Sequence, residues 1–274
     1  MNHIICYFLI FFMESVILWQ YSSNLFVPRR SLPARITILC VLYCLLFFAA
    51  SLFQSNGINA FLYLFSDFIF LETQYRLKAQ SAFFHSAILS AVMGMCELLV
   101  YGIFKCFAPH FLENGRDAFH LFLFATFSKL LFFTITHILI HYLKGKKHYE
   151  QPNDNSVFFL LLVPLASLFI ILTFINIGES VSLSPELDFM IAISAISLLA
   201  ANLLVFSINQ YNQKKNMEFT EMQLLLQKES NSEEYYEMLR LQNENQRILI
   251  HDIKKHLQSI DLLNKQNEPD KIDA

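Results

Sequence analysis

Charged residues are scarce in this sequence of 274 residues. Asp, Glu, Lys and Arg make up 16% of the chain, whereas 55% of the residues are hydrophobic and the mean hydropathy is +0.41. A soluble globular domain has about 25% charged and about 45–50% apolar residues. The composition therefore excludes an average soluble globule.

Cysteine and glycine are also few. The spacing of the five cysteines matches neither a disulfide framework nor a zinc motif, and four of the five lie in apolar runs, which favours small buried side chains. His137 and His141 lie four residues apart, but no third ligand is apparent, and we interpret them as interfacial or packed histidines. We expect no metal site and no bound cofactor in this chain.

The charges are distributed unevenly. Residues 1–209 contain 11 Lys/Arg and 11 Asp/Glu, whereas the much shorter segment 210–274 contains 9 and 12. This predicts a polytopic transmembrane sensor domain over 1–209, followed by a polar extension. The extension is too short to form an independent globular catalytic domain.

Polar breaks separate the apolar block into runs close to the roughly 20 residues that cross a hydrocarbon core. We predict an all-α membrane protein with about seven spans, at 4–20, 36–54, 58–75, 82–104, 118–141, 156–177 and 187–209. The third span is the weakest, because its apolar part is short and contains Asp67. If it were re-entrant, six spans would remain.

Basic residues in the connections favour seven spans. Alternate connections carry only Lys105 and Arg116, and the other set carries Arg29, Arg30, Arg35, Arg76, Lys78, Lys144, Lys146, Lys147, Lys214 and Lys215. The positive-inside rule places the richer set in the cytoplasm. We therefore predict a multi-pass protein of a plasma membrane, with its N-terminus outside and its C-terminus cytoplasmic.

Four formal charges fall well inside the predicted spans, away from their ends: Glu14, Asp67, Glu97 and Lys129. A charge in the bilayer costs several kcal/mol, so such residues usually face the bundle interior or form pairs. Two interpretations stay open at this point. The four residues form a polar ligand pocket or ion path, or they form internal pairs such as Lys129 with Glu97.

The polar extension has the composition of a long helix, with no glycine and no proline before Pro269. A heptad frame fits its second half, with seam positions at Tyr235, Leu239, Gln242, Gln246, Leu249, Ile253, His256, Ile260 and Leu263. This pattern favours a parallel dimeric coiled coil, with a stutter near residues 229–234. The alternative is a single amphipathic helix. We divide the extension into a signalling linker at 210–248 and a second segment at 249–274.

In this heptad frame His251 falls at position f, which points to solvent, and Asp252 falls at the adjacent position g. A neutral imidazole is nucleophilic and can form a phosphoramidate, and an adjacent carboxylate can orient the ring and stabilise its proton. From the residues alone, an ordinary solvated helix face is the simpler interpretation of the pair.

The run Ile-His-Asp-Ile-Lys-Lys-His-Leu at 250–257, following a polytopic domain, resembles the phosphoacceptor box of Agr-type peptide-sensing histidine kinases of Gram-positive bacteria, which carry GHKL-type ATPase domains. The resemblance implies that His251 is the phosphoacceptor, Asp252 its acidic neighbour and His256 the second histidine of the box. Lys255 stands where Asn is common, which puts phosphatase activity in doubt, and Ile250 stands where Arg is common. Specific residues match only over 250–257.

The resemblance also implies partners: a homodimer, a cytoplasmic response regulator, an extracellular ligand that is a peptide in this family, and membrane lipid. Segment 249–274 would be the first helix of a histidine-phosphotransfer hairpin, with NEPDKIDA as its turn. ATP and Mg²⁺ would be held by an ATP-binding domain, whose Gly-rich motifs are missing because no glycine follows Gly178. We therefore expect a sensor kinase that lacks its ATPase domain and does not autophosphorylate alone.

Two other functions stay open beside this one. The first is a non-enzymatic receptor, decoy or scaffold that binds a signal or a full-length kinase. The second is a small transporter, prompted by the four charges in the spans, although Pro164 alone interrupts a span and no inverted repeat is evident. Nucleic-acid binding is not expected, because the extension is slightly acidic and has no basic stripe.

Overall fold

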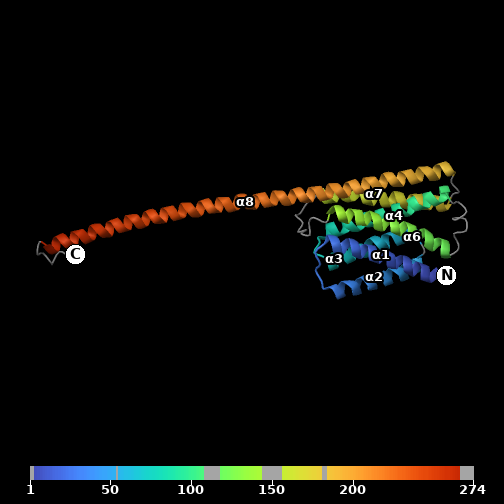
Figure 1. Ribbon diagram of the computed structural model, residues 1–274, viewed down its shortest axis with the longest axis horizontal. Helices are drawn as coiled ribbons and strands as arrows, with labels where there is room; N and C mark the ends of the chain where they lie inside the picture. Colours follow the sequence, from blue (N-terminus) through green and yellow to red (C-terminus); the bar gives the residue numbers. More distant parts are fainter. Residues whose placement is uncertain (1–2, 54, 108–117, 144–155, 181–183, 266–274) are drawn as a thin grey trace. The chain divides into compact units, whose positions relative to one another are not determined.

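The computed structural model describes residues 3–53, 55–107, 118–143, 156–180 and 184–265. These residues are almost entirely helical, which confirms the predicted all-α class (Figure 1). Within them the helices are α1 (His3–Leu25), α2 (Leu32–Phe53), α3 (Asn56–Gln74), α4 (Ala79–Phe107), α6 (Ala118–Leu143), α7 (Ser156–Ser180) and α8 (Pro185–Lys265).

Six of these helices are long and apolar enough to cross a membrane, by length and composition: α1, α2, α4, α6, α7 and α8. The described helix α3 is not among them, because Asp67, Glu72 and its polar ends lower its hydropathy. The outer surface of the other helices carries large apolar side chains, and Leu52 is 79% exposed. Such a surface is compatible with a multi-pass membrane protein.

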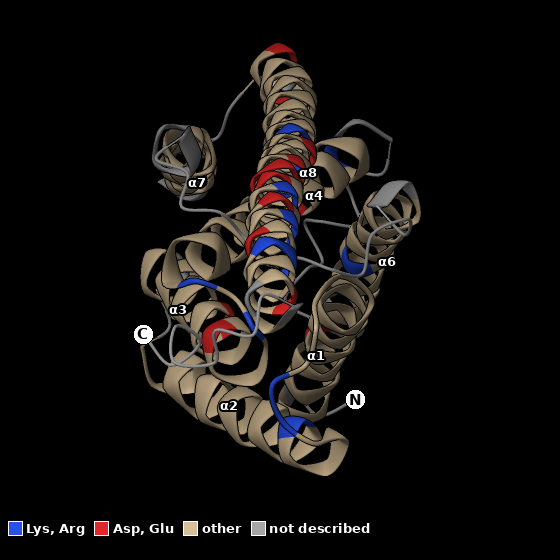
Figure 2. Cartoon of the chain, turned by 90° about the vertical axis from the view of Figure 1, so that its left-hand side faces the viewer, with Lys and Arg blue, Asp and Glu red and all other residues tan. Residues whose placement is uncertain are grey.

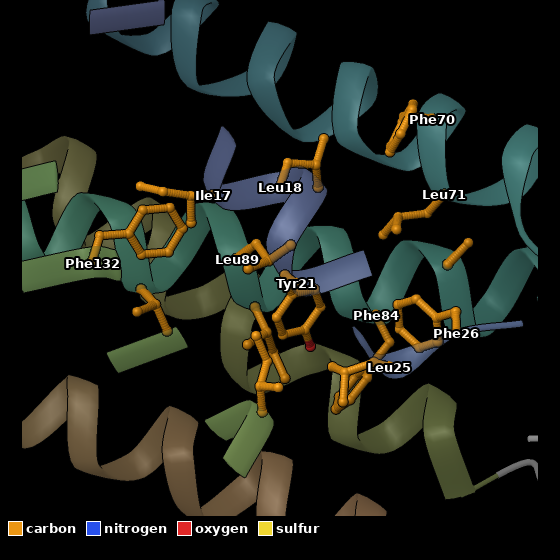
Figure 3. Packing of buried hydrophobic residues seen from close by; sticks show 14 of the residues in the cluster. Ile17, Leu18, Tyr21, Leu25, Phe26, Phe70, Leu71, Phe84, Leu89 and Phe132 are labelled. Carbon is orange, nitrogen blue, oxygen red and sulfur yellow. The ribbon is translucent and has the colours of Figure 1, made fainter. Parts of the chain in front are cut away.

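Helix α4 is the most buried of the membrane-length helices. It lies beside α3, α6 and α7, while α1 lies beside α2 and α6, and α2 lies beside α3. One face of α4 carries small buried residues, including Ala87 and Ala91, and these allow neighbouring helices to approach closely. The apolar core around α4 includes Tyr21, Phe70 and Phe84 (Figure 3).

Two connections meet at one end of the bundle. The backbone N–H of Arg29 donates to the carbonyl of Gln74 at 2.8 Å, and that of Arg76 donates to the carbonyl of Val27 at 3.0 Å. Pro28 and Tyr75 thereby form an isolated antiparallel bridge. Helix α3 therefore returns alongside α2 to the end where α2 begins. Both connections belong to the set that the basic residues assign to the cytoplasm, an assignment that stays a prediction.

Several features predicted from the sequence lie outside the described residues. They are the basic residues Arg116, Lys144, Lys146 and Lys147 and the expected turn at residues 267–274. The contact pattern divides the chain into two units, Met1–Gln213 and Lys214–Ala274. In the second unit the side chains of α8 are exposed almost throughout, apolar ones included.

Helix α8 begins with local signals for a helix start. Pro185 is its first residue, where a missing N–H costs nothing. The hydroxyl of Ser184 accepts a hydrogen bond from the backbone N–H of Leu187 at 3.4 Å. Asp188, in the first turn, forms an ion pair with Lys105 at 2.7 Å. This pair holds the start of α8 against the end of α4.

A close approach between α4 and α8 gives a first prediction. An added Cβ at Gly102 would lie 2.7 Å from the Cβ of Ala192, closer than real side chains come. We expect Gly102→Ala to lower the free energy of unfolding by about 1–3 kcal/mol, because the helices must separate. Thermal unfolding in detergent micelles measures the change.

The matched control is Gly178→Ala in α7, where an added Cβ meets nothing within 4 Å. This variant should unfold at or slightly above the wild-type temperature, because alanine favours a helix over glycine. Equal unfolding temperatures for the two variants would contradict the close contact at Gly102.

Candidate functional site

The structure brings three of the four charges in the predicted spans into one cluster. Lys129 of α6 places its Nζ 2.5 Å from Oε1 of Glu14 in α1 and 2.6 Å from Oε1 of Glu97 in α4. Lys129 and Glu14 are almost completely buried, while Glu97 is partly exposed. Of the two interpretations left open, the contacts show the internal pair, and Lys129 has a second carboxylate that the sequence did not indicate.

Asp67, the fourth charge, has a different partner. The hydroxyl of Tyr43 in α2 donates a hydrogen bond to Oδ1 of Asp67 in α3 at 3.1 Å, and both residues are buried. The phenol of Tyr63 in α3 lies close to the carboxylate of Glu14 and interacts with it. Sequence reasoning missed both tyrosines. For Tyr63 the sequence offered a signal, because Asn59, Tyr63 and Asp67 recur every four residues and so share one face of a helix. Tyr43 lies on another helix and has no part in this spacing.

This cluster joins three helices by charge. Lys129 is the cation that α1 and α4 share, so α1, α4 and α6 cannot separate without leaving a charge unpaired in a dry interior. Oε2 of Glu14 is buried and has no hydrogen-bond partner. The cluster combines one cation with carboxylates, an arrangement that can couple the positions of three helices.

His137 and His141, the pair four residues apart on α6, have different surroundings. Nδ1 of His137 lies 3.0 Å from Nε2 of Gln20 in α1, and the ring of Phe133 stacks on the imidazole. His141 is exposed. Among the described residues there is no group of three or more His, Cys, Asp or Glu side chains that could hold a metal ion.

A second buried polar contact lies among aromatic rings. The hydroxyl of Tyr21 in α1 and Nδ1 of His85 in α4 are 2.8 Å apart. Rings of Phe26, Phe84 and Phe206 surround the imidazole, with the centroid of Phe26 at 4.8 Å. Phe206 belongs to α8, so this contact links α1 and α4 to the helix that continues into the second unit.

A second link to α8 comes from α7. The amide of Asn202 in α8 donates to the hydroxyl of Ser167 in α7 at 2.7 Å, and both side chains are buried. Together with Lys105–Asp188 and the ring of Phe206, this contact fixes the first part of α8 to two neighbouring helices.

The candidate phosphoacceptor lies in the second unit, on α8. The side chains of His251 and Asp252 are 63% and 58% exposed, and Nδ1 of His251 lies 3.6 Å from Oδ1 of Asp252. That distance is too long for a hydrogen bond, but it places the carboxylate beside the ring. If a small movement of these exposed side chains let Nδ1 donate to the carboxylate, the lone pair on Nε2 would be available.

The other residues of the candidate box are also accessible. Lys255 follows His251 by one helical turn, and His256 follows Asp252 in the same way; both are exposed. The arrangement offers a nucleophilic nitrogen with an acid beside it. Comparison with protein-family models, with curated proteins and with solved structures finds no match to this chain.

Proposed function

We propose that the chain is the membrane sensor and phosphoacceptor part of a two-component histidine kinase, in the plasma membrane of a bacterium. The observation that supports this most directly is the exposed His251 with Asp252 beside it. They lie on α8, a helix whose first part packs within an apolar bundle. Residues 250–257 resemble a phosphoacceptor box, and this resemblance indicates the reaction that His251 would undergo.

The reaction proceeds at Nε2 of His251. The nitrogen attacks the γ-phosphorus of ATP, a P–N bond forms, the bond between that phosphorus and the β–γ bridging oxygen breaks, and ADP leaves. The carboxylate of Asp252 stabilises the positive charge that the imidazole acquires. ATP and Mg²⁺ are held by an ATPase domain, and a response regulator later accepts the phosphoryl group.

The apolar stripe on the second unit supports a homodimer. Leu249, Ile253 and Ile260 occupy seam positions of the heptad frame and are exposed in the single chain. A second copy that packs in parallel would cover them and leave His251 outside the seam. The side chain of Leu263, the last seam position, lies outside the described residues.

Cysteine cross-linking tests this dimer. We expect Ile253→Cys, at a seam position, to form a disulfide-linked dimer in membranes under mild oxidation, because the seam residues of two parallel helices face each other. Lys254→Cys, one residue further and outside the seam, is the matched control and should cross-link at least several-fold less. Equal yields from the two positions would contradict the parallel register.

In this proposal an external ligand, a peptide by the resemblance, changes the packing of the bundle. The change reaches α8 through contacts that α4 and α7 make with three residues of this helix, Phe206, Asn202 and Asp188. A rotation or shift of α8 would then alter the access of the ATPase domain to His251.

Phosphorylation in trans tests the proposal itself. The full chain in membranes is mixed with the separate ATPase domain of a peptide-sensing histidine kinase and with ATP labelled at the γ-phosphate. We expect a label on this chain that is stable to base and labile to acid, as a phosphoramidate is. If ATPase domains that label their own kinases leave this chain unlabelled, the phosphoacceptor role is wrong.

A further inference from the structure

Four arginines gather around the bridge between two connections of the bundle. Arg29 and Arg76 flank the Pro28–Tyr75 bridge through their backbone hydrogen bonds, and Arg30 follows directly. Nη1 of Arg35, near the start of α2, donates to the hydroxyl of Tyr75 at 3.1 Å. Figure 2 views the bundle from this end, with Lys and Arg in blue.

Arg35 is a buried cation that forms no ion pair with any carboxylate of the described residues. Its side chain is 8% exposed, its Nε has no hydrogen-bond partner, and its guanidinium lies over the rings of Trp19 and Tyr75 at 5.0 and 5.5 Å. Cation–π contacts offset only part of the cost of removing a charge from water. An anion bound close to this guanidinium would lower that cost.

The described residues supply no such anion. In the part of the chain that the structure describes, none of these four arginines forms an ion pair with a carboxylate. Arg29, Arg30 and Arg76 are exposed, so their guanidinium groups are accessible. A guanidinium can bind a phosphate through two parallel hydrogen bonds. Clustered arginines are therefore typical of sites that bind phosphate groups.

The neighbouring surface is apolar, which favours a lipid over a free anion. Leu32 and Ile36, in the first turns of α2, are 56% and 43% exposed. Trp19, the one tryptophan of the chain, packs beside Arg35, as expected for a residue at a membrane–water interface. A phosphate group at the arginines would therefore leave its acyl chains against apolar helix surface.

We propose that Arg29, Arg30 and Arg76 bind the phosphate of an anionic phospholipid, with the acyl chains along Leu32 and Ile36. The buried charge of Arg35 adds to the positive potential and holds Tyr75 in place. Basic pockets between transmembrane helices bind such headgroups in other membrane proteins. This site requires only that the bundle is in a membrane, and it does not depend on the kinase proposal.

Native mass spectrometry of the full chain tests the site. The detergent-solubilised protein is offered equal amounts of phosphatidylglycerol and phosphatidylcholine, and the fraction that carries each lipid is measured. We expect the wild type to retain phosphatidylglycerol preferentially. The affinity should fall roughly fivefold for each arginine removed, so on the order of a hundredfold in Arg29→Gln/Arg30→Gln/Arg76→Gln.

Two control variants separate this site from general charge effects. Lys228→Gln/Arg240→Gln/Arg247→Gln removes three exposed cations from the second unit and should keep the preference. Replacing the three arginines by lysine keeps the charge but removes the paired hydrogen bonds of the guanidinium, so the affinity should lie between those of the wild type and the triple-glutamine variant. Equal lipid retention in the triple-glutamine variant and the wild type would overturn the proposal, as would an equal loss in the control from the second unit.

A further experiment distinguishes a lipid headgroup from free phosphate as the ligand. Phosphatidylglycerol should raise the thermal unfolding temperature of the wild type, and the triple-glutamine variant should lose this gain while unfolding normally in its absence. Inorganic phosphate at the same concentration should not reproduce the effect. If it does, the arginines bind a soluble anion and the lipid assignment is wrong.

Discussion

Replacing Lys129 by methionine should destabilise the bundle strongly. The substitution keeps the length of the side chain but removes the cation shared by Glu14 and Glu97. Breaking a buried pair by removing one partner costs about 3–5 kcal/mol, because the remaining charge stays buried. We expect Lys129→Met to unfold at a much lower temperature in detergent than the wild type, measured by the loss of helical circular dichroism.

The rescue experiment distinguishes charge from packing. Neutral replacement of a complete buried ion cluster is often tolerated, so Lys129→Met combined with Glu14→Gln and Glu97→Gln should recover most of the lost stability. The control is Lys214→Met, which removes an exposed partner of Glu218 at 3.6 Å and should change stability by less than about 1 kcal/mol. If the triple variant is no more stable than Lys129→Met, unpaired charge is not the cause of the loss.

Replacing His251 by alanine should abolish phosphorylation in trans. Only the imidazole offers the nucleophilic nitrogen, so the acid-labile label should fall to background, at least a hundredfold below wild type, in the assay with a separate ATPase domain. Asp252→Asn keeps the shape of the side chain but removes its charge. It should slow labelling by about a hundredfold, because the imidazolium loses its stabilising partner.

The matched control for His251→Ala lies one helical turn earlier on the same face. Arg247 is exposed, and Arg247→Ala should leave labelling near the wild-type rate. A label that persists in His251→Ala would show that another residue is the acceptor. A label lost equally in Arg247→Ala would indicate damage to the helix surface that the ATPase domain contacts.

The sequence predicted the helices well because their cause is local. A run of about 20 apolar residues has to form a helix in lipid, where backbone groups have no water to bond. The third segment is the weakest of the predicted spans, and among the described helices of the bundle α3 is too polar to count as membrane-length. The exposure of His251 on a helix also followed from local periodicity and composition, whereas its chemical role stays a prediction.

The buried contacts could not be derived in the same way. Lys129 with Glu97 was one of two open interpretations, and the contact of Lys129 with Glu14 joins residues 115 positions apart along the chain. The sequence analysis did not predict two further pairs, Tyr43 with Asp67 and Tyr21 with His85, although each pair is buried and hydrogen-bonded. No local pattern marks such pairs, because each depends on which helices become neighbours.

The sequence by itself determined that this protein is built from apolar helices followed by a polar, helix-forming extension with an accessible histidine. Only the tertiary structure decided that α1, α4 and α6 share one buried cation, and that the connections carrying Arg29 and Arg76 pair at the bridge between Pro28 and Tyr75, where Arg35 bonds Tyr75. The physical reason is that lipid and bundle interior are both apolar. The apolar pattern of a span therefore shows little about which face contacts a neighbouring helix, and contacts between polar groups become visible only once the helices are packed.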